Sequence, residues 1–175
     1  MPAFYSKVFP MMQKEYSILN GLVKGLGGFL SVMLCGIISD RFELRNRMIK
    51  SQLSIAGALL AIPLMAGCCL FEGTNFYLSL GLFGLKFLIS EGWMAPTVTM
   101  MQSTVKPEFQ GGIVSAYLFF LTASGCASTL IMSKCANIFQ ANAFPHVYGK
   151  LIFFGSLIGY LGSIPCYWKA GKYYI

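Results

Sequence analysis

Charged residues are scarce in this 175-residue sequence, making up only 11% of it, whereas a soluble domain has about 25%. Hydrophobic residues account for 56%. So few charges cannot cover a water-facing surface, which argues against a disordered chain, a coiled coil and a secreted disulfide scaffold. The composition instead predicts an integral membrane protein. Because a spanning helix needs about 20 residues, the length allows about five or six spans.

Patterns of catalytic and metal-binding residues are also missing. One histidine, His146, and six cysteines without a C-x-x-C spacing provide no zinc site. There is no Ser/His/Asp set and no phosphate-binding G-x-x-x-x-G-K loop. We therefore expect no enzyme, no cofactor and no metal. The net charge of +7 is not arranged as a basic stripe interleaved with aromatics, so we also expect no nucleic-acid partner.

What the sequence does contain is five apolar segments with the length and low charge of transmembrane helices. The expected fold is therefore an all-α membrane protein whose main partner is the lipid bilayer. Small residues four apart, such as Gly155, Gly159 and Ser163, predict that the helices pack closely. The five spans cover about residues 18–38, 51–71, 76–97, 109–133 and 151–168.

The loop over residues 39–50 carries four basic residues and predicts the orientation of the chain. By the positive-inside bias this loop is cytoplasmic, or faces the equivalent compartment of an organelle. Alternation then places the tight turn at 72–75 and the loop at 134–150 outside, and the loop at 106–108 and the C-terminal tail inside. Five spans also put the N-terminus outside, although residues 1–17 lack the apolar core of a signal peptide. We therefore expect the chain to be incomplete at its front end.

The first span ends in Gly36-x-x-x-Asp40-Arg41, followed closely by Arg45. A glycine allows close helix crossing, and a carboxylate at the membrane face can pair with arginines in one conformation and release them in another. This segment resembles the loop signature G-x-x-x-D-R/K-x-G-R/K-R/K of the major facilitator superfamily, with Glu43 in place of the second glycine. The resemblance implies a conformational latch made of Gly36, Asp40, Arg41 and Arg45.

Residues 90–112 agree with that resemblance. Glu91 followed by Trp93, and the V-K-P-E-F-Q-G-G turn that begins at Val105, resemble the tenth helix, inner loop and eleventh helix of such transporters, especially of the spinster-like branch. Gln110 stands where that branch usually has arginine. The resemblance maps the five spans onto helices 8 to 12, and residues 1–17 onto an outer segment at the end of helix seven. It therefore implies the C-terminal half of a transporter.

The third span carries two charges near mid-membrane, Lys86 and Glu91, where a charge costs a few kcal/mol. They are five residues apart, about 140° around a helix, so a direct pair requires long, bent side chains. In the family the tenth helix lines the central cavity. Our hypothesis is a substrate path in which Lys86 contacts an anion, Glu91 couples a proton and Trp93 lines the pocket. The alternatives are structural pairs or snorkelling for the charges, and an interfacial position for Trp93.

The resemblance implies transmembrane transport of a small solute, coupled to protons, by the rocking of two six-helix halves. One half provides only half of the cavity between them. This chain would then need a second transporter half, a homodimer or another membrane protein partner. Two alternatives stay open: a structural subunit of a larger membrane complex that does not transport, and an incomplete transporter fragment.

Overall fold

The computed structural model describes residues 2–70, 75–139, 141 and 144–174. Every regular element in this part of the chain is a helix, which confirms the predicted all-α class. Five helical segments are long and apolar enough to cross a membrane, the number predicted. The turn expected at 72–75 lies outside the described residues except for Asn75. The five segments are Pro10–Glu43, Ile49–Cys69, Phe76–Ser103, Pro107–Ile138 and Val147–Tyr174.

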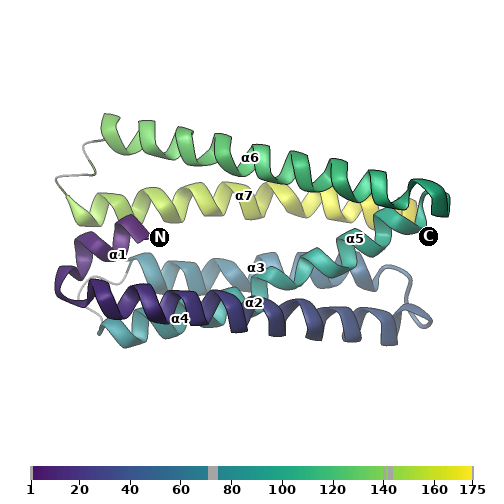
Figure 1. Cartoon of the computed structure of the whole chain (residues 1–175), viewed down its shortest axis with the longest axis horizontal. Coiled ribbons are helices and arrows are strands. Elements are labelled where there is room, and N and C mark those ends of the chain that lie inside the picture. Colours follow the sequence, from purple (N-terminus) through teal and green to yellow (C-terminus); the bar gives the residue numbers. More distant parts are fainter. Residues whose placement is uncertain (1, 71–74, 140, 142–143, 175) are drawn as a thin grey trace.

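Three helices form one side of the bundle (Figure 1). The long helix α2 (Gln13–Glu43) and helix α3 (Ile49–Leu70) are joined by a short loop, and α4 (Phe76–Ser90) packs against both. The chain then passes through a 3-10 turn, η2 (Glu91–Trp93), into α5 (Met94–Ser103). The third membrane segment is thus built from three consecutive helical pieces.

The other side of the bundle contains α6 (Gln110–Ile138) and α7 (Pro145–Tyr174), of which α7 packs along α3 (Figure 1). A short 3-10 turn, η3 (Pro107–Phe109), precedes α6. Lys106 has an extended ψ of 150°, because a following proline excludes the helical conformation. Helix α6 is poorly covered: none of its most apolar 18-residue stretch is buried, against 33% for α3. One face of the bundle therefore lacks a partner within the described chain.

The two ends of the bundle collect different segments (Figure 1). The loop after α2, the connection between α5 and α6, and the C-terminus lie at one end, which we call the basic-loop end. The start of α2, the start of α4 and the start of α7 lie at the opposite end, together with α1 (Pro2–Val8) and the turn η1 (Pro10–Met12). This is the grouping that alternating spans require. Which side of the membrane each end faces stays a prediction.

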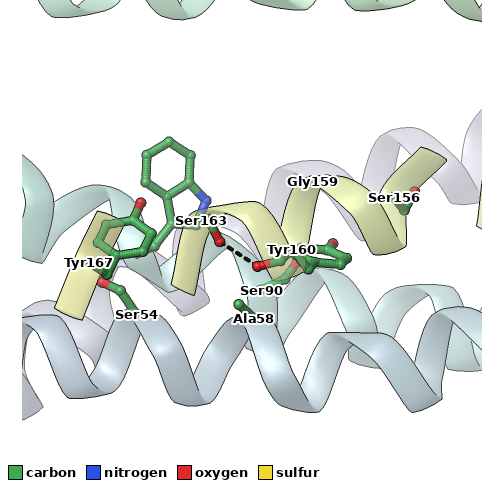
Figure 2. Close-up of a pocket in the computed structure, with 9 residues that line it drawn as sticks. Ser54, Ala58, Ser90, Ser156, Gly159, Tyr160, Ser163 and Tyr167 are labelled. Carbon is green, nitrogen blue, oxygen red and sulfur yellow. Dashed lines mark hydrogen bonds between the residues drawn. The ribbon is translucent and has the colours of Figure 1, made fainter. Parts of the chain in front are cut away.

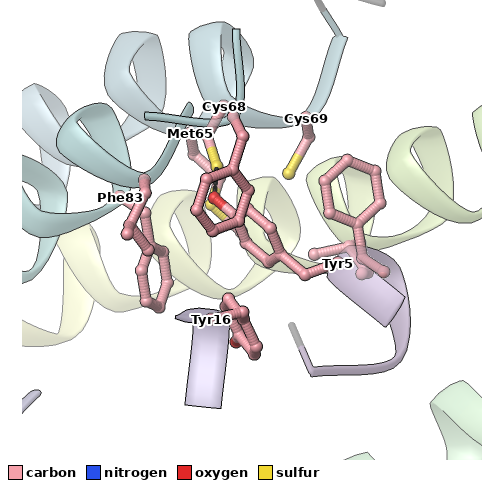
Figure 3. Packing of buried hydrophobic residues seen from close by; sticks show 10 residues of the cluster. Tyr5, Tyr16, Met65, Cys68, Cys69 and Phe83 are labelled. Carbon is pink, nitrogen blue, oxygen red and sulfur yellow. Dashed lines mark hydrogen bonds between the residues drawn. The ribbon is translucent and has the colours of Figure 1, made fainter. Parts of the chain in front are cut away.

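A compact hydrophobic cluster closes the end that contains α1 (Figure 3). We call it the terminal core, and at its centre Tyr5 is 1% exposed and stacks on Tyr16 with 4.4 Å between ring centroids. The hydroxyl of Tyr5 lies 2.9 Å from Ser79 Oγ and 3.3 Å from Cys68 Sγ. Burial raises the pKa of Tyr5, so the phenol stays protonated and able to donate. Together these contacts hold α1 against α3 and α4.

Candidate functional site

The third membrane segment is broken at η2, midway along its length. Pro96 has no N–H to bond the carbonyl oxygen of Gly92 four residues earlier, so one α-helical hydrogen bond is missing at this point, which favours a break. The chain instead makes the 3-10 turn of residues 91–93 and resumes as α5. Such a turn within a helix often marks a functional hinge, and broken helices form binding sites in many transporters.

The break at η2 packs closely against α2. Gly92 is buried there, and a Cβ atom at this position would overlap the side chain of Cys35 and come within 3.4 Å of the carbonyl oxygen of Ser31. Nearby, a Cβ built on Gly36 would lie 3.7 Å from the Cβ of Ala95 in α5. Glycines on both sides of this crossing therefore allow the broken segment to approach α2 closely.

A cavity of about 410 Å³ lies between α3, α7 and the break (Figure 2). Its walls come from positions near the middle of three membrane segments: Ala58 in α3, Ser90 at the junction of α4 and η2, and Gly159 in α7. We call it the mid-depth cavity. Its lining consists of small and aromatic residues: Ser54, Ala58, Ser90, Trp93, Ser156, Gly159, Tyr160, Ser163 and Tyr167.

Two of the three residues expected to form a substrate path lie at this cavity. Trp93 belongs to its lining and makes an edge-to-face contact with Tyr117 of α6, with 6.5 Å between ring centroids. Lys86 is half-buried in α4, and its Nζ lies 5.0 Å from the Phe87 ring centroid and 5.9 Å from that of Tyr160. These are cation–π distances. Because Tyr160 is part of the lining, Lys86 lies directly behind one wall of the cavity.

The third predicted residue, Glu91, is placed differently. It is half-buried as the first residue of η2 and is not part of the cavity lining. Within the described residues, no ion pair joins Glu91 to Lys86, as the angular separation of the two positions suggests. The structure thus places Trp93 in the cavity lining and Lys86 behind it, against Tyr160, and leaves Glu91 at the hinge. The roles assigned to these residues stay hypotheses.

The predicted latch residues lie where α2 ends, at the basic-loop end. Asp40, Arg41 and Arg45 are exposed, and no ion pair connects Asp40 to either arginine in the described part of the chain. Gly36, the fourth member, packs toward α5 through its contact with Ala95. The structure therefore leaves the latch charges exposed at the basic-loop end of the bundle, and a latch that closes between them stays a prediction.

An ion pair that the sequence analysis missed lies beside them. Lys50 Nζ donates to Glu43 Oε1 at 2.7 Å, and the hydroxyl of Tyr174 donates to the same oxygen at 2.5 Å. Only 5% of the Lys50 side chain is exposed. Glu43 is the residue that replaces the second glycine of the family signature. That departure from the signature was the signal that the sequence offered. The pair joins the end of α2 to the start of α3, and Tyr174 connects both to the end of α7.

The serines of the cavity were also not selected as site residues in the sequence analysis. Ser163, together with Gly159, was interpreted there as a packing residue. Ser90 is 6% exposed, and its Oγ has no hydrogen-bond partner among the described atoms. Ser54 Oγ donates to the carbonyl oxygen of Lys50 at 3.1 Å, and Ser163 Oγ donates to that of Tyr160 at 2.8 Å. The sequence signal for these serines was a hydroxyl group inside a membrane segment. The signal was not sufficient, because the serines come from three separate helices and meet only in the folded bundle.

Comparison with known proteins adds one similarity. The chain is 25% identical over 174 residues to an MFS-type efflux pump of Mycolicibacterium smegmatis. The match covers 99% of this chain and 40% of the pump, so the chain spans less than half the length of this curated relative. No family model and no solved structure matches. The similarity supports major facilitator membership and a transporter-type, non-enzymatic function in general, and with the five apolar helices it supports a multi-pass membrane protein.

Proposed function

We propose that this chain is part of a major facilitator transporter that moves a small solute across a membrane. The observation that carries the proposal is the similarity to an efflux pump along 99% of the chain. Five helices of spanning length are consistent with it. The same similarity favours transport over the alternative of a structural subunit without transport.

We also propose that the five long helices correspond to helices 8 to 12 of such a transporter, with residues 1–17 at the end of helix seven. The Gly36–Arg41 signature supports this assignment to the C-terminal half. The uncovered surface of α6 supports a second transporter half, or another membrane protein partner, packed on that side. The spinster-like branch rests on the pattern in residues 90–112 alone.

In the proposed mechanism the break at η2 is the hinge. Trp93 belongs both to the hinge and to the cavity, so that an occupant of the cavity bears directly on the angle between α4 and α5. Helix α5 in turn contacts α6 and leads to the basic-loop end. Glu91, at the start of the hinge, couples this movement to a proton, since protonation removes its charge from the membrane interior. Lys86, which stands outside the cavity lining, provides a positive charge that attracts an anionic group of the solute elsewhere along the path.

The test uses the natural full-length protein in proteoliposomes loaded with a pH-sensitive dye, under an imposed proton gradient. A panel of small solutes is added, and solute-dependent proton flux is recorded. We expect at least one solute to drive flux, and Lys86→Ala and Glu91→Gln each to reduce that flux at least tenfold. Matched controls are Lys24→Ala and Glu108→Gln, which change exposed charges outside the proposed path. Wild-type flux in both site variants, with normal expression, would contradict the assigned path.

The structural-subunit alternative makes the opposite prediction. It expects the protein, purified from its natural membrane in mild detergent, to elute with a large complex and to show no flux with any solute. A transporter elutes alone or as a small oligomer and shows flux. Elution volume and flux measured on the same preparation therefore decide between the two functions.

A further inference from the structure

Ser90 belongs to the lining of the mid-depth cavity, and its buried Oγ has no hydrogen-bond partner among the described atoms (Figure 2). Its side chain is almost fully buried, and a buried polar group without a partner costs about 1–3 kcal/mol. That cost falls if a bound molecule supplies an acceptor atom within hydrogen-bond distance. The other hydroxyls with assigned bonds, those of Ser54 and Ser163, already donate to backbone carbonyls and can only accept further bonds. Among the described lining residues, Ser90 is therefore the one whose buried hydroxyl lacks a partner, and an acceptor on a ligand would satisfy it.

The remaining walls are suited to an aromatic ring. Trp93, Tyr160 and Tyr167 come from η2 and α7 and border the same space. Aromatic pairs contribute about 0.5–1.5 kcal/mol beyond the area they bury. The volume of about 410 Å³ lies within the range of roughly 300–1,000 Å³ that is usual for small-molecule sites. Shape and lining together favour a compact ligand with one or two rings.

The charge around the cavity selects against ions. None of its described lining residues is Asp, Glu, Lys, Arg or His. A charged ligand would leave water for the middle of the bundle without a partner, which costs several kcal/mol. Lys86, behind Tyr160, additionally repels a cation. Glu91, the acidic residue of the same membrane segment, does not reach the lining.

We propose that the mid-depth cavity is a binding site for an uncharged aromatic molecule that carries a hydrogen-bond acceptor, which Ser90 binds. The acceptor is a carbonyl or ether oxygen, and the rings lie against Trp93 and Tyr160. The proposal concerns binding and does not depend on whether the bound molecule is transported. It can therefore fail while the transporter proposal stands, and the reverse also holds.

The probe is benzophenone, an uncharged two-ring ketone, and the readout is tryptophan fluorescence. The chain has two tryptophans, and Trp168 is outside the cavity, so Trp168→Phe leaves Trp93 as the reporter. We expect saturable quenching of Trp93 in the purified full chain in mild detergent. The reciprocal variant Trp93→Phe leaves Trp168 and reports only partition of the probe into the micelle, so its quenching should not saturate. Identical quenching curves for the two variants would overturn the proposal.

Two glycines of α7 provide a matched pair of blocking variants. A Cβ atom built on either glycine meets no atom within 4 Å, but Gly159 belongs to the cavity lining and Gly162 does not. In the Trp168→Phe background, Gly159→Leu should weaken benzophenone binding at least tenfold, and Gly162→Leu should leave it within twofold. Equal affinities for the two variants would contradict binding in this cavity.

The hydrogen bond and the charge preference are tested separately. Ser90→Ala should weaken binding about fivefold, the usual contribution of one hydrogen bond. The cationic relative 4-benzoylbenzyl-trimethylammonium and the anionic relative 4-benzoylbenzoate should each bind at least tenfold more weakly than benzophenone. If Ser90→Ala binds benzophenone with full affinity, the assignment of Ser90 as the hydrogen-bond donor is wrong. If either ion binds as tightly as benzophenone or more tightly, the preference for an uncharged ligand is wrong.

Discussion

The terminal core and the mid-depth cavity share three helices, α3, α4 and α7, and differ in what fills the space between them. At the end of the bundle, Tyr5 of α1 occupies that space, and Ser79 and Cys68 satisfy its hydroxyl. In the middle no side chain does so, and Ser90 has no partner. The terminal core therefore shows, within one molecule, how these helices hold an aromatic ring with a polar group. We expect the cavity to hold a ligand in the same way, with an aromatic ring between the helices and a polar group bonded to a serine.

The largest effect should come from emptying the terminal core. Tyr5→Ala removes a fully buried ring together with its hydrogen bond to Ser79, and we expect a loss of about 3–5 kcal/mol in the free energy of unfolding. Tyr5→Phe keeps the ring and should cost about 1 kcal/mol. Both are measured by thermal and SDS-induced unfolding of the full chain in mild detergent. Wild-type stability of Tyr5→Ala would show that the packing of α1 does not stabilise the bundle.

The next effect tests the crossing between the break and α2. Gly92→Ala places a Cβ atom inside the volume of Cys35, and we expect a loss of about 3 kcal/mol, measured by the same unfolding assays. Gly81→Ala is the matched control, because a Cβ atom there meets nothing within 4 Å. The double variant Gly92→Ala with Cys35→Gly should recover part of the loss. If Gly92→Ala is as stable as Gly81→Ala, the close approach of the break to α2 is wrong.

A smaller effect is expected at the basic-loop end, where polar groups are again satisfied within the chain. Glu43→Gln leaves Lys50 buried without its carboxylate partner. We expect a loss of about 1–2 kcal/mol, less than for a fully buried pair because Glu43 is 31% exposed. Asp40→Asn, which changes an exposed carboxylate, should alter stability by less than about 0.5 kcal/mol. Equal losses from the two variants, read from thermal unfolding midpoints, would show that the Glu43–Lys50 pair contributes nothing specific.

The smallest effect on stability is expected in the cavity itself. Ser90→Ala removes a buried hydroxyl that has no partner, so the unliganded protein should be as stable as the wild type or about 1 kcal/mol more stable. Thermal unfolding without ligand measures this change. A loss above about 1 kcal/mol would mean that Ser90 has an internal role comparable to that of Ser79 in the terminal core.

The number and class of the helices could be predicted because each depends on a local property, a run of apolar residues of spanning length. The break could also have been predicted in part, since Pro96 alone removes a helical hydrogen bond to Gly92. The contact of Gly92 with Cys35 could not, because it depends on how two distant helices cross.

For the same reason, only part of the candidate site could be identified from the sequence. Lys86 and Trp93 stand out in the sequence because one is charged and the other aromatic within an apolar segment. The structure places Trp93 in the cavity lining and Lys86 behind Tyr160, and the roles of both stay predictions. Ser90 looked like any other small residue, and its unsatisfied hydroxyl emerges only when α3 and α7 close around it. Glu43 and Tyr174 are separated by 131 residues, so no local pattern predicts their hydrogen bond.

The central claim is that the mid-depth cavity holds an aromatic ligand, while the terminal core is filled by Tyr5. Photo-cross-linking with benzophenone tests this claim most directly. The full chain is irradiated with the bound probe, and the adducts are located by mass spectrometry. We predict adducts in α3 and α7 around Ala58 and Tyr160, lost in Gly159→Leu and retained in Gly162→Leu. Adducts spread evenly along the exposed surfaces of α2 and α6, and unchanged in Gly159→Leu, would contradict a ligand site in the cavity.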